Sequence, residues 1–227
     1  MAKYWTPGRV KTRLGQSIGN EHAAAIHRQF VLHLASSLQF VADRRVFAVS
    51  PTDRMSDFLA ALPQERWEIT SQASGDLGRR IEFWFRSSLT TLDVSQQISS
   101  VLIGADCPTL SEAEVDTAFE QLNSHDVVLG PASDGGYYLI GLRSPWRPAY
   151  QRLFADIPWS GDKVFDMTVQ RVDEAGLQST AMNMQEDIDT IADLNRLRSA
   201  LAKSRVQDSG DRDLALAIES ILGESQP

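Results

Sequence analysis

The sequence has 227 residues, of which 42% are hydrophobic and 23% are charged. These proportions are ordinary for a soluble globular protein and exclude disordered and collagen-like chains. The formal net charge of −8 argues against nucleic-acid binding through a basic face. The longest stretch without an acid, a base or a histidine, residues 94–105, is too short and too polar to span a membrane. Because a single cysteine, Cys107, permits no intramolecular disulfide, we expect a cytoplasmic protein.

Helical and strand-like patterns alternate along most of the chain. Helices are expected near residues 20–38, 53–62, 78–91, 111–123, 162–175 and 190–203, and strands near 44–50, 66–70, 99–106, 126–132, 136–142 and 179–184. The apolar run at 99–106 is typical of a buried parallel strand. This alternation predicts an α/β fold, a three-layer sandwich with a mostly parallel sheet, in one domain over residues 1–203. Residues 204–227 are expected to form a peripheral helix and tail.

Three of the expected helices begin at residues that can cap them. Asn20 can cap the helix that runs to about residue 38. Ser111 and Glu114 have the spacing of a capping box. Thr190 is a candidate cap for the helix that runs to residue 203.

A basic segment, TPGRVKTRLG, occupies residues 6–15. Gly8 allows the backbone to approach a ligand closely, and Arg9, Lys11 and Arg13 follow it in a stretch of twenty residues without an acid. Guanidinium groups pair with phosphate oxygens, and an ammonium adds a point charge. The segment matches neither a Walker A loop nor a GxGxxG fingerprint. It predicts a diphosphate site, with a solvated basic loop as the alternative.

Acidic residues stand at two positions where such a sheet binds ligands. Asp106 ends the segment 99–106, directly after its apolar residues and at the carboxyl edge, where a carboxylate can hold a hard divalent cation. Its alternative role is a turn or helix cap. Asp187 and Asp189 precede the last expected helix, and Asp189 is either a second metal ligand or a partner of the helix dipole. A cation between two carboxylates would remove their repulsion.

Two further segments combine glycine with polar residues. In residues 130–142, Asp134 precedes Gly135 and Gly136, which permit close approach of a ligand or form a plain hairpin turn. The segment SGDLGRR, residues 74–80, places glycines and arginines at a helix start, a pattern typical of anion sites.

Six segments in order resemble the radical-SAM/selenodomain-associated transferase family, type 1, a branch of the GT-A nucleotide-diphospho-sugar transferases. They are PGRVKTRL (7–14), SGDLGRR (74–80), GADCPTL (104–110), GPASDGGYYLIGL (130–142), IPWSGDKVFDMT (157–168) and DIDT (187–190). The resemblance covers about residues 3–200. It implies a GT-A fold, a nucleotide-sugar donor and a divalent metal, Mg²⁺ or Mn²⁺. It also implies kinship with nucleotidyltransferases that act on phospholactate or molybdopterin.

The resemblance also suggests roles for individual residues. Donor nucleotide and phosphate binding is expected at Gly8, Arg9, Lys11, Arg13, Gly75, Asp76 and Arg79. The acceptor side is expected at Gly135, Gly136, Tyr137, Trp159 and Ser160. Asp106 and Asp189 would bind the metal, and Asp134 is the candidate catalytic base.

The sequence departs from the family pattern in two places. A lone Asp106 before Cys107 and Pro108 replaces the Asp-x-Asp triplet, as it does in the nucleotidyltransferase relatives. Only MAKYW stands where the family has a full first strand, and we expect the true start to lie upstream.

The leading hypothesis is a metal-dependent glycosyltransferase that uses a nucleotide-sugar donor and a small-molecule acceptor. The first alternative is a nucleotidyltransferase that joins an NTP to a phosphorylated small molecule and releases pyrophosphate. The second is a catalytically silent nucleotide-binding protein.

Overall fold

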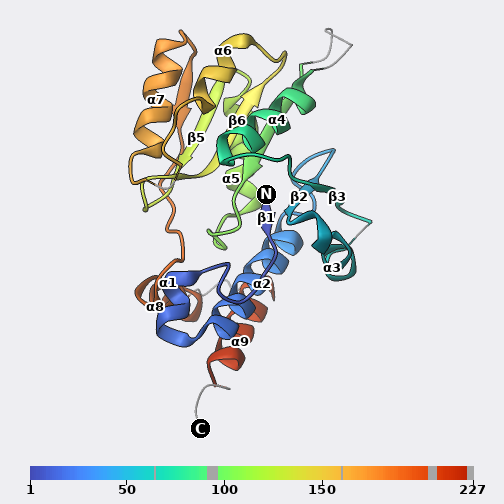
Figure 1. Cartoon of the computed structure of the whole chain (residues 1–227), viewed down its shortest axis with the longest axis vertical. Coiled ribbons are helices and arrows are strands. Elements are labelled where there is room, and N and C mark those ends of the chain that lie inside the picture. The colour runs from blue at the N-terminus through green and yellow to red at the C-terminus, as the bar shows by residue number, and fades with distance from the viewer. Residues whose placement is uncertain (64, 91–96, 160, 204–208, 224–227) are drawn as a thin grey trace. The chain divides into compact units, whose positions relative to one another are not determined.

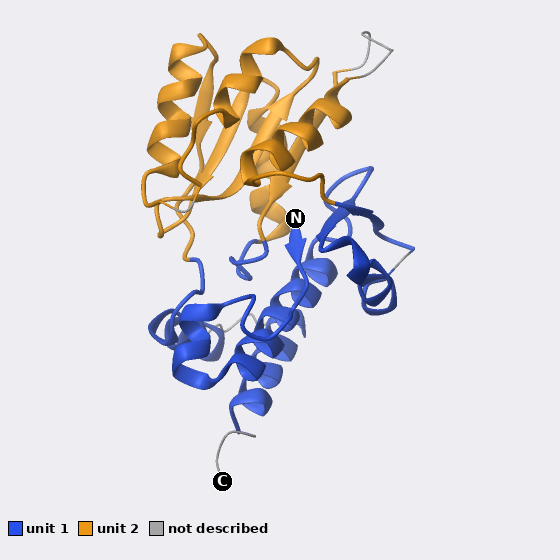
Figure 2. Ribbon diagram, in the orientation of Figure 1, with its two compact units in different colours: residues 1–71, 105–110, 187–227 blue, residues 72–104, 111–186 orange. Residues whose placement is uncertain are grey.

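The computed structural model describes residues 1–63, 65–90, 97–159, 161–203 and 209–223. The chain divides into two compact units (Figure 2). Unit 1 contains residues 1–71, 105–110 and 187–227, and unit 2 contains residues 72–104 and 111–186. Each unit is therefore assembled from segments that are distant in the sequence. A single domain over residues 1–203 stays a prediction.

Unit 1 contains a parallel sheet with the strand order β1-β2-β3. Its strands are β1 (Ala2–Lys3), β2 (Val46–Ser50) and β3 (Glu68–Ser71). The short β1 pairs with the end of β2. The 3-10 turn η1 (Thr52–Arg54) and helix α3 (Met55–Ala61) follow β2.

Four helices of unit 1 share one hydrophobic core. They are α1 (Thr12–Ile18), α2 (Asn20–Ser37), α8 (Ile191–Lys203) and α9 (Ser209–Gly223). The core side chains recur at helical spacing, and they include Ile26 and Phe30 of α2, Leu194 of α8, and Leu214 and Ile218 of α9. Figure 1 shows α9 running alongside α2. The tail that was expected to be peripheral thus contributes to this core.

Unit 2 contains a mixed sheet with the strand order β4-β6-β5-β7. Its strands are β4 (Ser99–Ile103), β5 (Val127–Pro131), β6 (Tyr137–Arg143) and β7 (Ser179–Ala181). Its helical segments are α4 (Leu77–Leu89), α5 (Glu112–Gln121), α6 (Pro148–Gln151), the 3-10 turn η2 (Arg152–Phe154) and α7 (Val164–Glu174). Both α4 and α5 pack against β4.

The α/β fold with mostly parallel strands is confirmed, since three of the five strand pairings in the described residues are parallel. The parallel pairing predicted for residues 99–106 is wrong. β4 ends at Ile103, keeps partial exposure and runs antiparallel to β6. The β5–β6 hairpin reverses the chain and inserts β6 between β5 and β4, and an apolar run carries no information about strand direction.

The predicted helix caps have mixed outcomes. The capping box of α5 is confirmed, with Ser111 N donating to Glu114 Oε2 at 2.9 Å and Glu114 N donating to Ser111 Oγ at 3.3 Å. The cap predicted at Asn20 is wrong. Gly19 precedes α2 with a positive φ of +86°, and Asn20 is already helical. Among the described residues, no helix combines the length and the hydropathy that a membrane crossing requires.

Candidate functional site

The basic segment forms a turn between β1 and α1 in unit 1. Arg9 N donates to Thr6 O at 3.0 Å, and Gly8 has φ +71°. Lys11 has φ +46°, and among the described residues the only other non-glycine residue with positive φ is Asp156. A left-handed conformation costs a non-glycine residue about 1–2 kcal/mol, so other interactions must hold Lys11 in place. Such strained residues are concentrated at functional sites.

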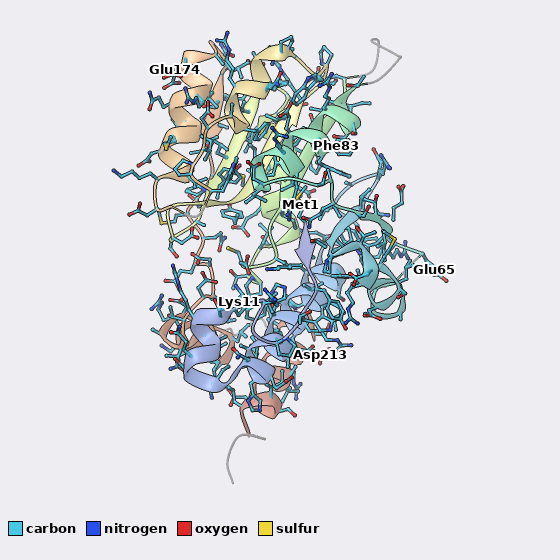
Figure 3. All side chains as sticks on the ribbon, in the orientation of Figure 1. Met1, Lys11, Glu65, Phe83, Glu174 and Asp213 are labelled. Carbon is cyan, nitrogen blue, oxygen red and sulfur yellow. The ribbon has the colours of Figure 1, made fainter. Side chains whose placement is uncertain are left out.

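The Lys11 side chain lies between two carboxylates. Its Nζ atom contacts Asp106 Oδ1 and lies 3.1 Å from Asp189 Oδ1. Only 2% of the Lys11 side chain is exposed (the residue is labelled in Figure 3). The structure therefore brings the two predicted metal ligands together on one ammonium group, although they are distant in the sequence.

Backbone contacts fix this convergence. Ile188 N donates to Asp106 O at 3.0 Å, which ties the segment that contains Asp189 to the segment that follows β4. Asp193 Oδ2 accepts hydrogen bonds from Asp189 N at 3.1 Å and from Thr190 N at 2.7 Å. Thr190 Oγ1 accepts from Asp193 N at 3.3 Å, so Thr190 caps α8 as predicted.

Sequence reasoning missed Asp193 as a positioning residue. Its carboxylate accepts from the backbone of Asp189 and leaves the Asp189 carboxylate facing Lys11. The signal that could have found it was the three-residue spacing from Thr190, which is the spacing of a capping box.

The charges of the three side chains stabilise one another. Burial alone would lower the pKa of the Lys11 ammonium, but Asp106 and Asp189 outweigh burial and hold that pKa above its usual value. Loss of hydration works to raise the pKa of Asp106, but Lys11 outweighs it and lowers that pKa. The Asp106 side chain still exposes 53% of its surface, so solvent reaches the carboxylate. Both groups therefore stay charged at neutral pH.

His27 lies in the same region of unit 1. The residue is buried, its Nε2 lies 3.0 Å from Lys3 O, and Nδ1 has no hydrogen-bond partner within the described part of the chain. Burial lowers the pKa of His27, so the ring is neutral at pH 7. A neutral ring beside Asp106 adds no positive charge to the site.

The other two cations of the basic segment are more exposed than Lys11. The Arg13 guanidinium lies 4.0 Å from Asp189 Oδ2, and 70% of its side chain is exposed. Arg9 is also exposed, and its carbonyl accepts a hydrogen bond from Lys3 Nζ at 2.8 Å. Both guanidinium groups are thus accessible to an anionic ligand, whereas the Lys11 ammonium is already paired.

The carboxylates of unit 1 suit a hard divalent cation. Carboxylate oxygens of Asp106 and Asp189 converge on one position, and the Nζ atom of Lys11 occupies it. Asp187, which is buried, places a carboxylate oxygen within 4.8 Å of one of Asp189. Oxygen donors of this kind fit Mg²⁺ and Mn²⁺.

In unit 2, Asp134 forms the turn between β5 and β6. Its Oδ1 accepts from Gly136 N at 2.8 Å. Gly135 has φ +87°, and a Cβ at this position would collide with Asp162 O. The segment is therefore a tight hairpin turn, which was the alternative to a ligand site. A catalytic role for Asp134 stays a prediction.

Two aromatic residues expected on the acceptor side contact each other in unit 2. The rings of Tyr137 and Trp159 meet edge to face at 6.3 Å, and Trp159 packs against Gly78 of α4. The Tyr137 hydroxyl is buried without a hydrogen-bond partner in the described ranges, and burial raises the pKa of Tyr137. Ser160 lies outside the described residues.

The SGDLGRR segment forms the start of α4, also in unit 2. Asp76 Oδ1 accepts from Arg79 N at 2.9 Å, so the Asp76 carboxylate caps the helix. Gly75 has φ +108°, and its carbonyl accepts from Arg80 Nε at 2.9 Å. A phosphate-binding role for Gly75, Asp76 and Arg79 stays a prediction.

The chain is similar to proteins from several bacteria. It is 31% identical over 148 residues to a 3-phospho-D-glycerate guanylyltransferase from Phenylobacterium zucineum (strain HLK1), a match that spans 62% of this chain but only 65% of the relative. It superimposes with a TM-score of 0.84 on a provisionally named nucleotide-diphospho-sugar transferase from Desulfovibrio desulfuricans G20. That structure is 30% identical, over 99% of this chain and 95% of the other. Residues 34–161, which are more than half of the chain, match the sequence model of one protein family. The chain therefore belongs to the DUF2064 family, described as uncharacterized proteins conserved in bacteria.

Proposed function

We propose that the protein is a divalent-metal-dependent transferase whose donor is a nucleoside triphosphate or a nucleotide-diphospho-sugar. The observation that carries this proposal is the convergence of Asp106 and Asp189 on Lys11. Carboxylates that can hold a cation, next to exposed guanidinium groups, match the charge distribution of a metal-bound diphosphate.

Each residue of the site has a role in this proposal. Asp106 and Asp189 hold the cation, which neutralises charge on the donor phosphates when bound. Arg9, Lys11 and Arg13 would bind oxygens of the donor phosphates. Asp193 keeps Asp189 in position through the start of α8.

Nucleotidyl transfer is the reaction to test first. It is the activity named for the Phenylobacterium relative, and the lone Asp106 before Cys107 and Pro108 is where the sequence resembles nucleotidyltransferases rather than proteins with an Asp-x-Asp triplet. An acceptor phosphate oxygen attacks the α-phosphorus of the NTP, the bond to the bridging oxygen breaks, and pyrophosphate leaves. The acceptor is already an anion at neutral pH, so the reaction needs no base from the protein.

Glycosyl transfer is the second candidate. It is favoured by the similarity to the Desulfovibrio protein over almost the whole chain. In this reaction an acceptor hydroxyl attacks the anomeric carbon of the donor, and a nucleoside diphosphate leaves. For inversion the hydroxyl needs a base, and Asp134 remains the candidate.

One assay separates these reactions. The protein is incubated with Mn²⁺ and either NTPs or nucleotide sugars, with phosphorylated and unphosphorylated small acceptors, starting with GTP and 3-phospho-D-glycerate. Acceptor-dependent release of pyrophosphate supports nucleotidyl transfer, and release of a nucleoside diphosphate from a nucleotide sugar supports glycosyl transfer. Metal-dependent nucleotide binding without turnover would support a silent binding protein, and absence of binding would contradict the proposal altogether.

A further inference from the structure

We infer that Lys11 is a displaceable internal cation, which occupies the carboxylate pair until a divalent metal and a nucleotide bind together. The inference rests on the proposed function, because it assigns Asp106 and Asp189 to the metal. It adds that the site binds the metal weakly when no nucleotide is present and more tightly when a nucleotide binds as well.

The contacts of Lys11 carry the first step. Its Nζ contacts Asp106 Oδ1 and lies 3.1 Å from Asp189 Oδ1, with 2% of the side chain exposed. A metal bound to these two oxygens would stand within a few ångströms of the ammonium, where two positive charges repel strongly. The ammonium must therefore leave the oxygens before the metal can bind between them.

Once displaced, the Lys11 ammonium needs a new negatively charged partner. A lysine that is removed from its carboxylates and left buried without a counter-charge is costly. The metal alone supplies no such partner, whereas a nucleotide brings phosphate oxygens. The exposed Arg13, 4.0 Å from Asp189, marks the side from which an anion can approach. The displaced ammonium would then pair with a phosphate while the metal takes the carboxylates.

This exchange makes metal and nucleotide affinity interdependent. By linkage, a nucleotide that draws Lys11 away raises metal affinity, and the metal raises nucleotide affinity by the same factor. A purely structural ion pair makes a different prediction. In that case removal of Lys11 would lower stability and leave the metal affinity of the free protein unchanged or weaker.

The test measures Mn²⁺ binding to the full chain by electron paramagnetic resonance of free Mn²⁺, with and without GTP. In the wild type we expect Mn²⁺ to bind at least about tenfold more tightly when GTP is present. In Lys11→Met, Mn²⁺ should bind to the nucleotide-free protein about tenfold more tightly than in the wild type, because the competing charge is gone. GTP affinity should fall in the same variant, so the two ligands respond in opposite directions.

Arg44→Met is the control, since it removes one positive charge from the same unit at an exposed ion pair with Glu68. It should change Mn²⁺ affinity of the nucleotide-free protein by less than about twofold. Lys11→Gln repeats the test with a polar side chain, and circular dichroism checks that each variant is folded. If neither Lys11 variant folds, the wild-type comparison decides, and equal Mn²⁺ affinity with and without GTP overturns the inference.

The failure of the inference and the failure of the proposed function give different results. Unchanged or weaker Mn²⁺ binding in nucleotide-free Lys11→Met overturns the displaceable cation, even if the wild type binds GTP with Mn²⁺. Absence of GTP binding to the wild type contradicts the proposed function for GTP, while the nucleotide-free comparison still decides the role of Lys11.

Discussion

Gly135 illustrates how one residue fixes the turn between β5 and β6. Its φ is +87°, and a Cβ at this position would overlap the carbonyl oxygen of Asp162, so no side chain fits there. Gly176 provides a matched control, because it has φ +66° but no atom within 4 Å of the Cβ position. We expect Gly176→Ala to lower the free energy of unfolding by about 1 kcal/mol, from backbone strain alone. Gly135→Ala should lower it by about 3 kcal/mol, because the clash adds to the strain.

Urea unfolding of the two glycine variants measures the difference directly. Equal losses in the two variants would show that the backbone moves away from Asp162 at little cost. The close approach of Asp162 would then not explain why glycine occurs at position 135.

Substitution of Asp134, which lies in the same turn, distinguishes between the two candidate reactions. Asp134→Asn keeps an oxygen that can accept from Gly136 N, so the turn should be retained. If the protein transfers a glycosyl group with Asp134 as the base, turnover at saturating donor should fall about 10²–10⁴-fold. If it transfers a nucleotidyl group to a phosphate, turnover should change little. Turnover of the variant with the identified donor decides between them, and undiminished glycosyl transfer would remove Asp134 from the role of base.

The start of α8 links a helix cap to the candidate metal site. Asp193 accepts from the backbone of Asp189 and Thr190, so Asp193→Ala should lower the free energy of unfolding by about 1 kcal/mol. It should also weaken Mn²⁺-dependent nucleotide binding about three- to tenfold, because Asp189 loses its support. The measurement is nucleotide affinity by isothermal titration calorimetry in the presence of Mn²⁺.

The capping box of α5 is the control for this prediction. Ser111→Ala removes the same kind of interaction from a helix of unit 2. It should cost a similar amount of stability and leave nucleotide affinity unchanged. Equal effects of the two variants on nucleotide affinity would mean that Asp193 acts only through stability.

A buried carboxylate joins β5, β6, α6 and β7 in unit 2. Asp126 Oδ1 lies 2.7 Å from the guanidinium groups of both Arg143 and Arg147, and Oδ2 accepts from Gln178 N at 3.0 Å. Burial would raise the pKa of Asp126, but these partners outweigh it and hold that pKa below its usual value. Asp126→Asn should lower the free energy of unfolding by about 2 kcal/mol at pH 7, since the partly exposed arginines regain some hydration.

The pH dependence of this loss follows from the sign of the pKa shift. A carboxyl whose pKa is lower in the folded state stabilises the protein above its unfolded pKa, and this contribution disappears as the pH falls through the folded pKa. The stability gap between the wild type and Asp126→Asn should thus be constant from pH 7 to about 5 and shrink below about 4. Urea unfolding across this range measures the gap, and a constant gap down to about pH 3 would contradict the proposed source of the stability.

At the scale of the whole molecule, local patterns predicted the elements well. Helical spacing located α2, α5 and α8, and turn residues located the β5–β6 hairpin, because these signals lie within a few neighbouring residues. The position of acids after a strand and before a helix also pointed to Asp106 and Asp189, which the structure brings together.

Features that depend on distant pairing were not predictable in this way. The antiparallel direction of β4 depends on β6, which lies beyond a helix and another strand. The burial of Lys11 between two carboxylates depends on three segments that meet only in the folded chain, so the sequence indicated only a phosphate-binding role for Lys11. The part played by α9 in the core of unit 1 likewise follows from its contact with α2.

The central claim is that Asp106 and Asp189 form one site that binds a divalent metal with a nucleotide phosphate. Isothermal titration calorimetry of GTP binding, with Mn²⁺ and with chelator, tests it most directly in the wild type, in Asp106→Asn and in Asp189→Asn. We expect GTP to bind the wild type only with Mn²⁺, and each variant to lose at least about tenfold in affinity. GTP binding that is equally tight with chelator, or that survives both substitutions unchanged, would contradict the claim.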